Sequence, residues 1–309
     1  MEIFRSLEAL PSPPAALAVA IGNFDGLHLG HRRIIDRLKS QAAARSLPAC
    51  VVSFAPHPDK VFGPARLCMI QTLDQRLEGL SALGLDAVVI LPFSRAFARR
   101  DGDEFVAKTL GEGLNARLVV VGADFRFGRD RGWGISDLRR LAGPNRFAVR
   151  IVPDVKRRGR IVRSSRIRDL LVSGRIEPAN ALLGRPYEIE GDVVAGDRRG
   201  RKLGFPTANI LTPNEILPRG IFITRLNRDG VAHPSVTSIG IRPTFGRHEV
   251  MVETHLLDFS GDLYGAPVRL TFLRKLRDEC RFSGPEALRA QIGLDAAAAR
   301  GYFRRRSEL

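Results

Sequence analysis

The chain has 309 residues, enough for roughly two domains of about 100–200 residues each. Its apolar fraction of 44% is ordinary for a globular protein, and it shows neither an apolar run near the ~20 residues that cross a bilayer nor a secretory signal, so we expect a cytoplasmic protein without membrane contact. The formal charge of +16 rests on 43 Arg against 6 Lys, which indicates arginine-rich surfaces in general rather than a dedicated nucleic-acid site.

Four apolar runs in the first half of the chain alternate with segments of helical length. The runs are residues 17–21, 49–54, 86–91 and 117–122, and a helix is predicted from His31 to about Ala44. This alternation predicts a parallel sheet covered by helices, that is, a Rossmann-like α/β domain. A nucleotide would bind at the carboxyl ends of the strands, where a Pro/His-rich loop (55–64) and a Gly/Arg-rich loop (122–134) follow two of the runs.

The pattern changes after Gly184, where we place the boundary between domains 1–184 and 185–309. Helices are predicted before it, at about 166–171 and 177–183. Beyond it, short strands separated by turn residues are predicted at 187–194, 221–226, 233–240, 252–259 and 267–273, which is typical of a small antiparallel β-barrel. Ser283 and the proline two residues later open a final helix. The predicted fold class is α/β followed by β, with a C-terminal helix.

Residues 22–31 read GNFDGLHLGH and join the first strand to the first helix. Glycines let the backbone approach an anion closely, and the free amides at a helix N-terminus favour negative charge. His28 and His31 can donate to one phosphoryl group; a structural role is the alternative, and the strand, glycines and helix around them favour function. The His-x-Gly-His pattern is shared by nucleotidyltransferases and class I aminoacyl-tRNA synthetases. Because no Walker A spacing occurs, adenylyl transfer is preferred to P-loop chemistry.

Three further segments carry residues suited to phosphate or metal. RSSRIR at 163–168 offers hydroxyls and guanidinium groups to a triphosphate, or is a solvated helix start. GDRRGRKLGFPTAN at 196–209 joins a basic glycine loop to Thr207 and Asn209, whose oxygens suit Mg²⁺ held against phosphates, although a generic basic turn would look similar. Glu253 alternates with His255 on one predicted strand and would, by itself, be interpreted as a surface carboxylate.

In their order and spacing, GNFDGLHLGH, FAPHP, GADFRFG and SSRIR resemble the FMN adenylyltransferase module of prokaryotic bifunctional riboflavin kinase/FAD synthetases. The resemblance implies adenylylation of FMN by ATP to give FAD, with His28 and His31 stabilising the transition state at the α-phosphate. ATP would be held by Gly22, Asn23, Phe24, Asp25, Ser164, Ser165 and Arg166. The flavin pocket would comprise Phe54, His57, Pro58, Asp124, Phe125 and Phe127, because aromatic faces suit a planar isoalloxazine. A plain core role is the alternative for the last two.

The second half resembles the riboflavin kinase of the same family through PTAN (206–209), IGIRPTF (239–245), VETHLLDF (252–259) and LRDE (276–279). This likeness implies phosphorylation of riboflavin to FMN, with Glu253 as the general base for the ribityl 5′-hydroxyl. The implied ATP contacts are Gly196, Gly200, Lys202, Gly204 and Thr207; the implied Mg²⁺ ligands are Thr207 and Asn209; the implied flavin contacts are Arg242 and Arg277. Riboflavin, FMN and ATP are the implied partners, and a homo-oligomer is left open.

The sequence departs from the family pattern in places. Arg163 stands where the family usually has serine, and Ser165 where it has threonine. An RNA-binding relative of tRNA synthetases is the main alternative, but it would need a KMSKS-like loop, and none of the six lysines lies in one. A scaffold with one inactive site is a second alternative. It is opposed by the presence of His28, His31, Thr207, Asn209 and Glu253.

Overall fold

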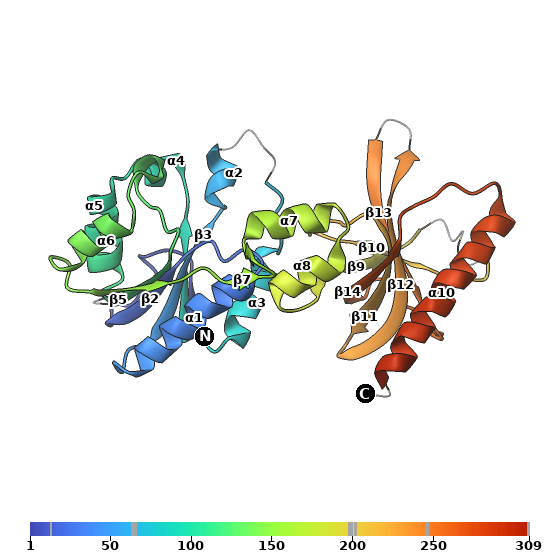
Figure 1. The fold of residues 1–309 in the computed structure, drawn as a ribbon, viewed down its shortest axis with the longest axis horizontal. Coiled ribbons are helices and arrows are strands. Elements are labelled where there is room, and N and C mark those ends of the chain that lie inside the picture. The colour runs from blue at the N-terminus through green and yellow to red at the C-terminus, as the bar shows by residue number, and fades with distance from the viewer. Residues whose placement is uncertain (13, 63–66, 197–199, 201–202, 245–246, 308–309) are drawn as a thin grey trace. The chain divides into compact units, whose positions relative to one another are not determined.

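A parallel sheet organises the first compact unit of the chain, Met1–Ser164 (Figure 1). The computed structural model describes all residues except 13, 63–66, 197–199, 201–202, 245–246 and 308–309, and within them the sheet has six strands in the order β1-β4-β3-β2-β5-β6. They are β1 (Glu2–Phe4), β2 (Leu17–Ile21), β3 (Ala49–Ala55), β4 (Ala87–Pro92), β5 (Ala116–Gly122) and β6 (Ala148–Val152). Strand order reverses between β2 and β5, so their carboxyl ends form the position where open α/β sheets bind nucleotides.

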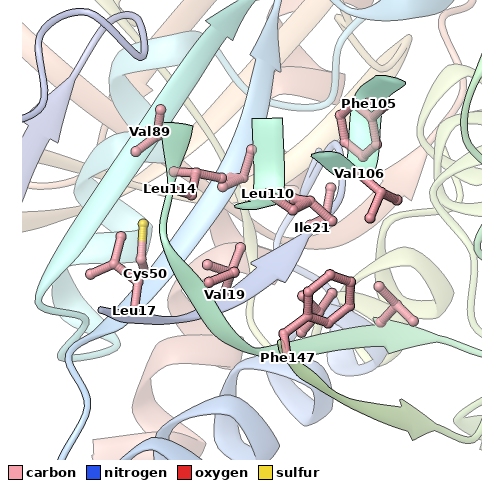
Figure 2. Close-up of a cluster of buried hydrophobic side chains, with 14 of the residues drawn as sticks. Leu17, Val19, Ile21, Cys50, Val89, Phe105, Val106, Leu110, Leu114 and Phe147 are labelled. Carbon is pink, nitrogen blue, oxygen red and sulfur yellow. The ribbon is translucent and has the colours of Figure 1, made fainter. Parts of the chain in front are cut away.

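Helices α1 (Leu29–Ala43) and α3 (Leu73–Ala82) cover one face of this sheet, and η1 (Phe105–Gly113) and α6 (Ile135–Ala142) cover the other. The unit also contains the short helical segments α2 (Pro58–Phe62), α4 (Arg95–Ala98), α5 (Gly102–Glu104) and η2 (Arg129–Arg131), and a small hairpin of β7 (Lys156–Arg157) and β8 (Arg160–Ile161). Because side chains alternate along a strand, Val19 and Ile21 pack into the cluster that η1 and α6 cover (Figure 2). Ala18 and Ala20 pack instead against α1 and α3.

A closed antiparallel barrel forms the centre of the second unit, Ser165–Leu309 (Figure 1). Its strands, in the order β10-β13-β12-β11-β14-β9, are β9 (Tyr187–Val194), β10 (Ala208–Leu211), β11 (Gly220–Arg228), β12 (Val231–Thr244), β13 (Arg247–Leu256) and β14 (Pro267–Arg277). Helices α7 (Ser164–Val172) and α8 (Ile176–Leu183) precede the barrel, and α10 (Pro285–Ser307) follows it. Ile223 and Val236 on the outer face of the barrel pack against Ala296 and Ala299 of α10. The predicted boundary after Gly184 falls inside this unit and stays a prediction.

The interior of the barrel contains a chain of buried hydroxyl groups. Thr224 Oγ1 lies 2.8 Å from Ser235 Oγ and 2.7 Å from Thr237 Oγ1, and Thr237 Oγ1 lies 2.9 Å from Thr254 Oγ1. All four side chains are fully buried. Each hydroxyl therefore has a partner inside the barrel, as buried polar groups require.

The predicted fold class is confirmed, and every predicted strand is present. The sequence interpretation missed β1, β6, β7, β8 and β10. The first and last of these are three and four residues long, too short to show a period, and β6 carries Arg150 in the middle of its apolar residues. Pairing with a neighbouring strand, rather than local pattern, makes these segments extended.

Candidate active sites

The loop between β2 and α1 holds the two histidines. His28 is the N-cap residue of α1, and its Nδ1 accepts a hydrogen bond from the backbone N–H of His31 (3.2 Å). Because Nδ1 is an acceptor, neutral His28 carries its proton on Nε2, which is then a donor. The two rings stack with centroids 3.6 Å apart and planes 15° apart. Both imidazoles thus lie together at a helix N-terminus, where an anion is favoured.

Glycine is needed beside these rings. A Cβ at Gly30 would lie 3.0 Å from Cε1 and 3.1 Å from Nδ1 of His28, so a larger residue would displace the ring. Phe24, in the same loop, is fully buried and adopts a left-handed φ of 51°, which is unusual for a bulky residue. Its ring centroid lies 5.2 Å from that of His31. The loop is therefore an uncommon backbone conformation that its surroundings must hold in place.

Two predicted ATP residues, Asp25 and Ser164, make hydrogen bonds within the protein. Asp25 is buried, and its carboxylate accepts hydrogen bonds from the backbone N–H groups of Ile70 (3.1 Å) and Gln71 (3.2 Å). Its carbonyl accepts from Ser164 Oγ (2.9 Å). These bonds fix the course of the chain after β2, and the predicted contacts of both residues with ATP stay predictions.

Ser165 and Arg166 belong to the second unit, so their predicted contact with ATP also stays a prediction. They lie in the first turn of α7. Nη1 of Arg166 is buried and has no hydrogen-bond partner among the described residues. A buried guanidinium N–H without a partner is costly unless an anion meets it, which suits a phosphate ligand.

Aromatic rings connect the predicted flavin residues of the first unit. Phe54, at the end of β3, lies 6.0 Å between centroids from Phe97, which lies 6.2 Å from Phe105. Phe105 lies 5.8 Å from Phe127, and Phe127 stacks on Phe125 at 5.5 Å. The structure therefore brings the three predicted phenylalanines into one continuous aromatic cluster.

Sequence reasoning missed several members of that cluster. Phe93 follows β4 directly and packs edge-on against Phe54 (5.6 Å between centroids). Trp133 packs against Phe127 at 6.2 Å. Phe93 comes directly after one apolar strand and Phe54 lies near the end of another, and this position at a strand end was the available signal. Phe127 is itself 7% exposed and part of the core, which agrees with the packing role given as the alternative, and its predicted contact with flavin stays a prediction.

Polar residues flank the aromatic cluster. His57 is buried, and its Nδ1 accepts a hydrogen bond from the backbone N–H of Asp59 (3.1 Å) at the start of α2, where Pro58 is the first residue. Asp124 is exposed and pairs with Arg163 (Nη1 to Oδ2, 3.7 Å), which also pairs with Asp154 (3.8 Å). Arg163, the departure from the family pattern, thus lies between two carboxylates.

The second candidate site lies on the outer face of the barrel. Asn209 of β10 and Glu253 of β13 are direct cross-strand partners, so their side chains emerge on the same face. Val252 and Thr254, the neighbours of Glu253, point into the barrel and are buried. Thr207 lies two residues before Asn209, immediately ahead of β10. The predicted base and the predicted metal ligands are therefore adjacent.

Segment 203–207 is anchored beside this site. His255, on the same strand face as Glu253, donates from Nδ1 to the carbonyl of Pro206 (2.9 Å), and its ring packs edge-on against Phe205 (5.4 Å). A Cβ at Gly196 would overlap the Asn209 amide, and a Cβ at Gly200 would lie 3.1 Å from Thr207 Oγ1. Both predicted glycines therefore let the loop lie against the candidate metal ligands.

The remaining predicted site residues of the second unit are Gly204, Lys202, Arg242 and Arg277, and their roles stay predictions. Gly204 is exposed with a φ of +85°, a conformation that favours glycine. Lys202 and the side chain of Arg242 lie outside the described residues. Arg277 makes a bidentate ion pair with the buried Asp295 of α10, at 2.7 Å from Nη2 and 3.1 Å from Nε, which raises the pKa of the arginine. Its guanidinium therefore connects β14 to α10, and its predicted contact with flavin stays a prediction.

Comparisons with known proteins agree with this arrangement. A family model described as FAD synthetase matches residues 11–166, and one described as riboflavin kinase matches residues 183–303. A bifunctional riboflavin kinase/FMN adenylyltransferase from Pseudomonas fluorescens is 38% identical, with 97% of each chain covered. One from Bacillus subtilis is 32% identical, covering 94% of this chain and 93% of the other. A crystal structure described as a macrolide-efflux protein from Streptococcus pneumoniae superposes with a TM-score of 0.88 at 29% identity, covering 96% and 98%.

An α/β domain with stacked histidines at a helix start, followed by a barrel with a carboxylate beside a glycine loop, defines a two-domain transferase. The chain belongs to the bifunctional riboflavin kinase/FMN adenylyltransferase family. It phosphorylates riboflavin to FMN and adenylylates FMN to FAD, using ATP in both reactions. Within the described part of the chain, no helix combines the length and apolar character needed to span a bilayer.

Proposed function

We propose that His28 and His31 carry the adenylyl transfer. A phosphate oxygen of FMN attacks the α-phosphorus of ATP, the bond from that phosphorus to the bridging oxygen breaks, and pyrophosphate leaves. Nε2–H of His28 and the imidazole of His31 would stabilise the negative charge that develops on the α-phosphate oxygens. The observation that supports this proposal is the 3.6 Å stacking of the two rings at the N-terminus of α1.

The substrates of this reaction would lie along the carboxyl ends of β2, β3 and β5. ATP would lie along the loop of residues 22–25 and beside Ser164, whose Oγ donates to the carbonyl of Asp25 (2.9 Å). FMN would pack its isoalloxazine on the aromatic cluster, near Phe54 and Phe125. The proposed positions of ATP and FMN are both supported by the reversal of strand order between β2 and β5, since ligands of open α/β sheets bind there. His57 and Asp124 would supply polar contacts beside the ring.

For the kinase reaction, we propose that Glu253 acts as the general base. It would accept the proton of the ribityl 5′-hydroxyl while that oxygen attacks the γ-phosphorus of ATP, and ADP leaves. The glycine loop that begins at Gly196 would cover the phosphates. Support comes from the direct pairing of Glu253 with Asn209 and from the contact of Gly196 with the Asn209 amide.

Magnesium fits the oxygen donors at this second site. Oδ1 of Asn209 is buried and has no hydrogen-bond partner among the described residues, and such an oxygen is costly unless a ligand meets it. Thr207 and Asn209 would hold Mg²⁺ together with the phosphates of ATP, because their side-chain oxygens are the kind of donor that this ion prefers. When bound, the ion would neutralise charge on those phosphates.

The cytoplasm is the proposed compartment. Cys50, Cys68 and Cys280 are free thiols, which suits a reducing environment. Measurement of the mass in solution tests whether the chain forms a homo-oligomer.

One experiment tests the proposed function as a whole. The purified protein is incubated with riboflavin, ATP and Mg²⁺, and the flavins are separated by chromatography. FMN should appear first and FAD should follow; in parallel, FMN and ATP alone should give FAD and pyrophosphate. Failure to form FMN from riboflavin, or FAD from FMN, would contradict the assignment of that site.

A further inference from the structure

Arg76, on α3, is almost wholly buried at 4% exposure, which is rare for an arginine. Its Nη1 donates to the carbonyl of Asn23 (2.7 Å), and its Nη2 donates to the carbonyl of Phe54 (3.2 Å). Burial lowers the pKa of Arg76, and the neighbouring Asp25 carboxylate opposes that shift. A buried cation on two backbone carbonyls is costly to place, so its position calls for a physical reason.

The two carbonyls belong to the two segments of the chain that would hold the two substrates. Asn23 lies in the loop after β2, between the glycine and the left-handed Phe24 described above. Phe54 lies at the end of β3, where the aromatic cluster begins. Ser53 Oγ also donates to the Asn23 carbonyl (3.1 Å). One guanidinium therefore connects the backbone of the ATP loop to the edge of the flavin pocket.

The position of Arg76 is fixed by its own helix and by the segment that precedes that helix. Thr72 and Gln75 form a capping box at the start of α3, which sets the first turn of the helix and hence the direction of Arg76. The carboxylate of Asp25 accepts from the N–H groups of Ile70 and Gln71 just before that turn. Loop 22–25 thus holds the start of α3, and α3 holds the loop through Arg76.

We propose that Arg76 is a positioning residue for FMN adenylylation: it sets the spacing between the ATP loop and the end of β3, and so the distance between the reacting phosphates. It touches neither substrate, because its guanidinium is enclosed by protein. Lysine cannot replace it fully, since one ammonium lacks the fork that reaches both carbonyls. The inference rests on the placement of ATP and FMN proposed above. A displacement of about 1 Å between bound reactants can lower a rate roughly 10²-fold.

The test compares Arg76→Lys and Arg76→Met with Arg45→Lys and Arg45→Met in the full-length protein. Arg45 lies just after α1, is exposed and donates to the carbonyl of Gln41, so it controls for the same chemical change. Single-turnover formation of FAD from FMN, with enzyme in excess, separates the rate constant from the fraction of active molecules. Riboflavin kinase activity of the same samples reports on the other domain.

We expect the rate constant for FAD formation to fall by about 10- to 100-fold in both Arg76 variants, less in Arg76→Lys. The amplitude and the kinase rate of the Arg76 variants should stay within about twofold of those of the parent. All three measurements should stay within that range in the Arg45 variants. The proposal is overturned if the rate constant is kept in both variants, or if only the amplitude falls, because loss of amplitude alone means a purely structural role. A parent enzyme that forms no FAD would instead contradict the adenylyltransferase site itself.

Discussion

The imidazole rings of His28 and His31 lie nearly parallel, with their centroids 3.6 Å apart. If both donate to the α-phosphate, His31→Ala should lower FAD formation from FMN by about 10²- to 10³-fold. FMN formation from riboflavin should persist, because that site lies in the other domain. Chromatography of both reactions checks this, and unchanged FAD synthesis would contradict the assigned role.

His28 needs a different control, because it also caps α1. His28→Ala removes the imidazole and the cap, and loss of a cap costs about 1 kcal/mol of stability. His28→Asn keeps a capping oxygen but has no imidazole. We therefore expect both variants to lose FAD formation to a similar extent, while thermal denaturation shows a lower midpoint for His28→Ala than for His28→Asn. Recovery of activity in His28→Asn would show that capping, rather than phosphate contact, is the main role of His28.

Glu253→Gln keeps the shape of the side chain but removes the proton acceptor. Kinase turnover should fall by about 10²- to 10⁴-fold if base catalysis is its main role, and FAD formation from added FMN should continue at the parental rate. Glu190→Gln is the matched control, because Glu190 is a strand carboxylate of the same barrel that pairs with Arg269 (3.6 Å). Parental FMN synthesis by Glu253→Gln would place the base elsewhere.

The fragment 185–309 should fold and phosphorylate riboflavin without the first half, since roughly 125 residues can form a core. Asn180 of α8, which this fragment lacks, donates to the carbonyl of Phe272 (2.9 Å) and accepts from the N–H of Tyr187 (2.7 Å). A fragment 165–309 should therefore be more stable by at least about 2 kcal/mol. Urea denaturation of the two fragments measures the difference.

Asn180→Ala within the longer fragment serves as its control. This variant keeps the apolar contacts of α8 but loses both hydrogen bonds, so its stability should lie between those of the two fragments. A folded fragment without kinase activity would show that the first half contributes to the kinase site.

Arg163→Ser should leave adenylylation within about tenfold of the parent, or ~1.4 kcal/mol. Arg163 is half-exposed and lies 3.7 Å from Asp124 and 3.8 Å from Asp154, and exposed ion pairs of this kind contribute little. The substitution restores the residue usual in the family. Steady-state kcat/KM for FMN measures the effect, and a much larger loss would mean that the arginine has become essential for binding phosphate.

Burial raises the pKa of the Cys50 thiol to about 12, above its value in an unfolded chain. The unfolded form therefore loses its proton first as pH rises, and the free energy of unfolding should fall from about pH 9 upward, by up to ~1.4 kcal/mol per pH unit. Cys50→Ala should remove this contribution, while Cys280→Ala, at an exposed thiol, should not. Urea denaturation at pH 8 and pH 10.5 compares the slopes.

The sequence predicted the fold where patterns are local. The strand ending at Ile21 and the helix after His28 followed from periodicity and from the glycines between them. Arg76 and Phe93 were missed, because their roles depend on which loops the sheet brings together. The capping-box pattern Thr72-x-x-Gln75 could have placed Arg76 in the first turn of a helix, but no pattern in the chain indicates that the helix faces Asn23 and Phe54.

Prediction of the second site relied on family resemblance more than on physics. Glu253 taken alone is a strand carboxylate among many, and its pairing with Asn209 depends on a register set by residues far apart in the chain. The ion pair of Arg277 could not be predicted from a local pattern either. Its partner Asp295 lies on α10, eighteen residues further on, and no local period connects the two.

The hydroxyl chain inside the barrel constrains how β11, β12 and β13 align. If β12 slipped by one residue, Ser235 and Thr237 would turn outward toward solvent or α10, and Thr224 would lose both of its partners. An interior hydroxyl without a partner costs about 1–3 kcal/mol, whereas a purely aliphatic lining would accept the shifted alignment at smaller cost. These four small polar side chains therefore favour a single alignment of the three strands, in which Glu253 of β13 lies opposite Ser238 of β12 on the outer face of the barrel.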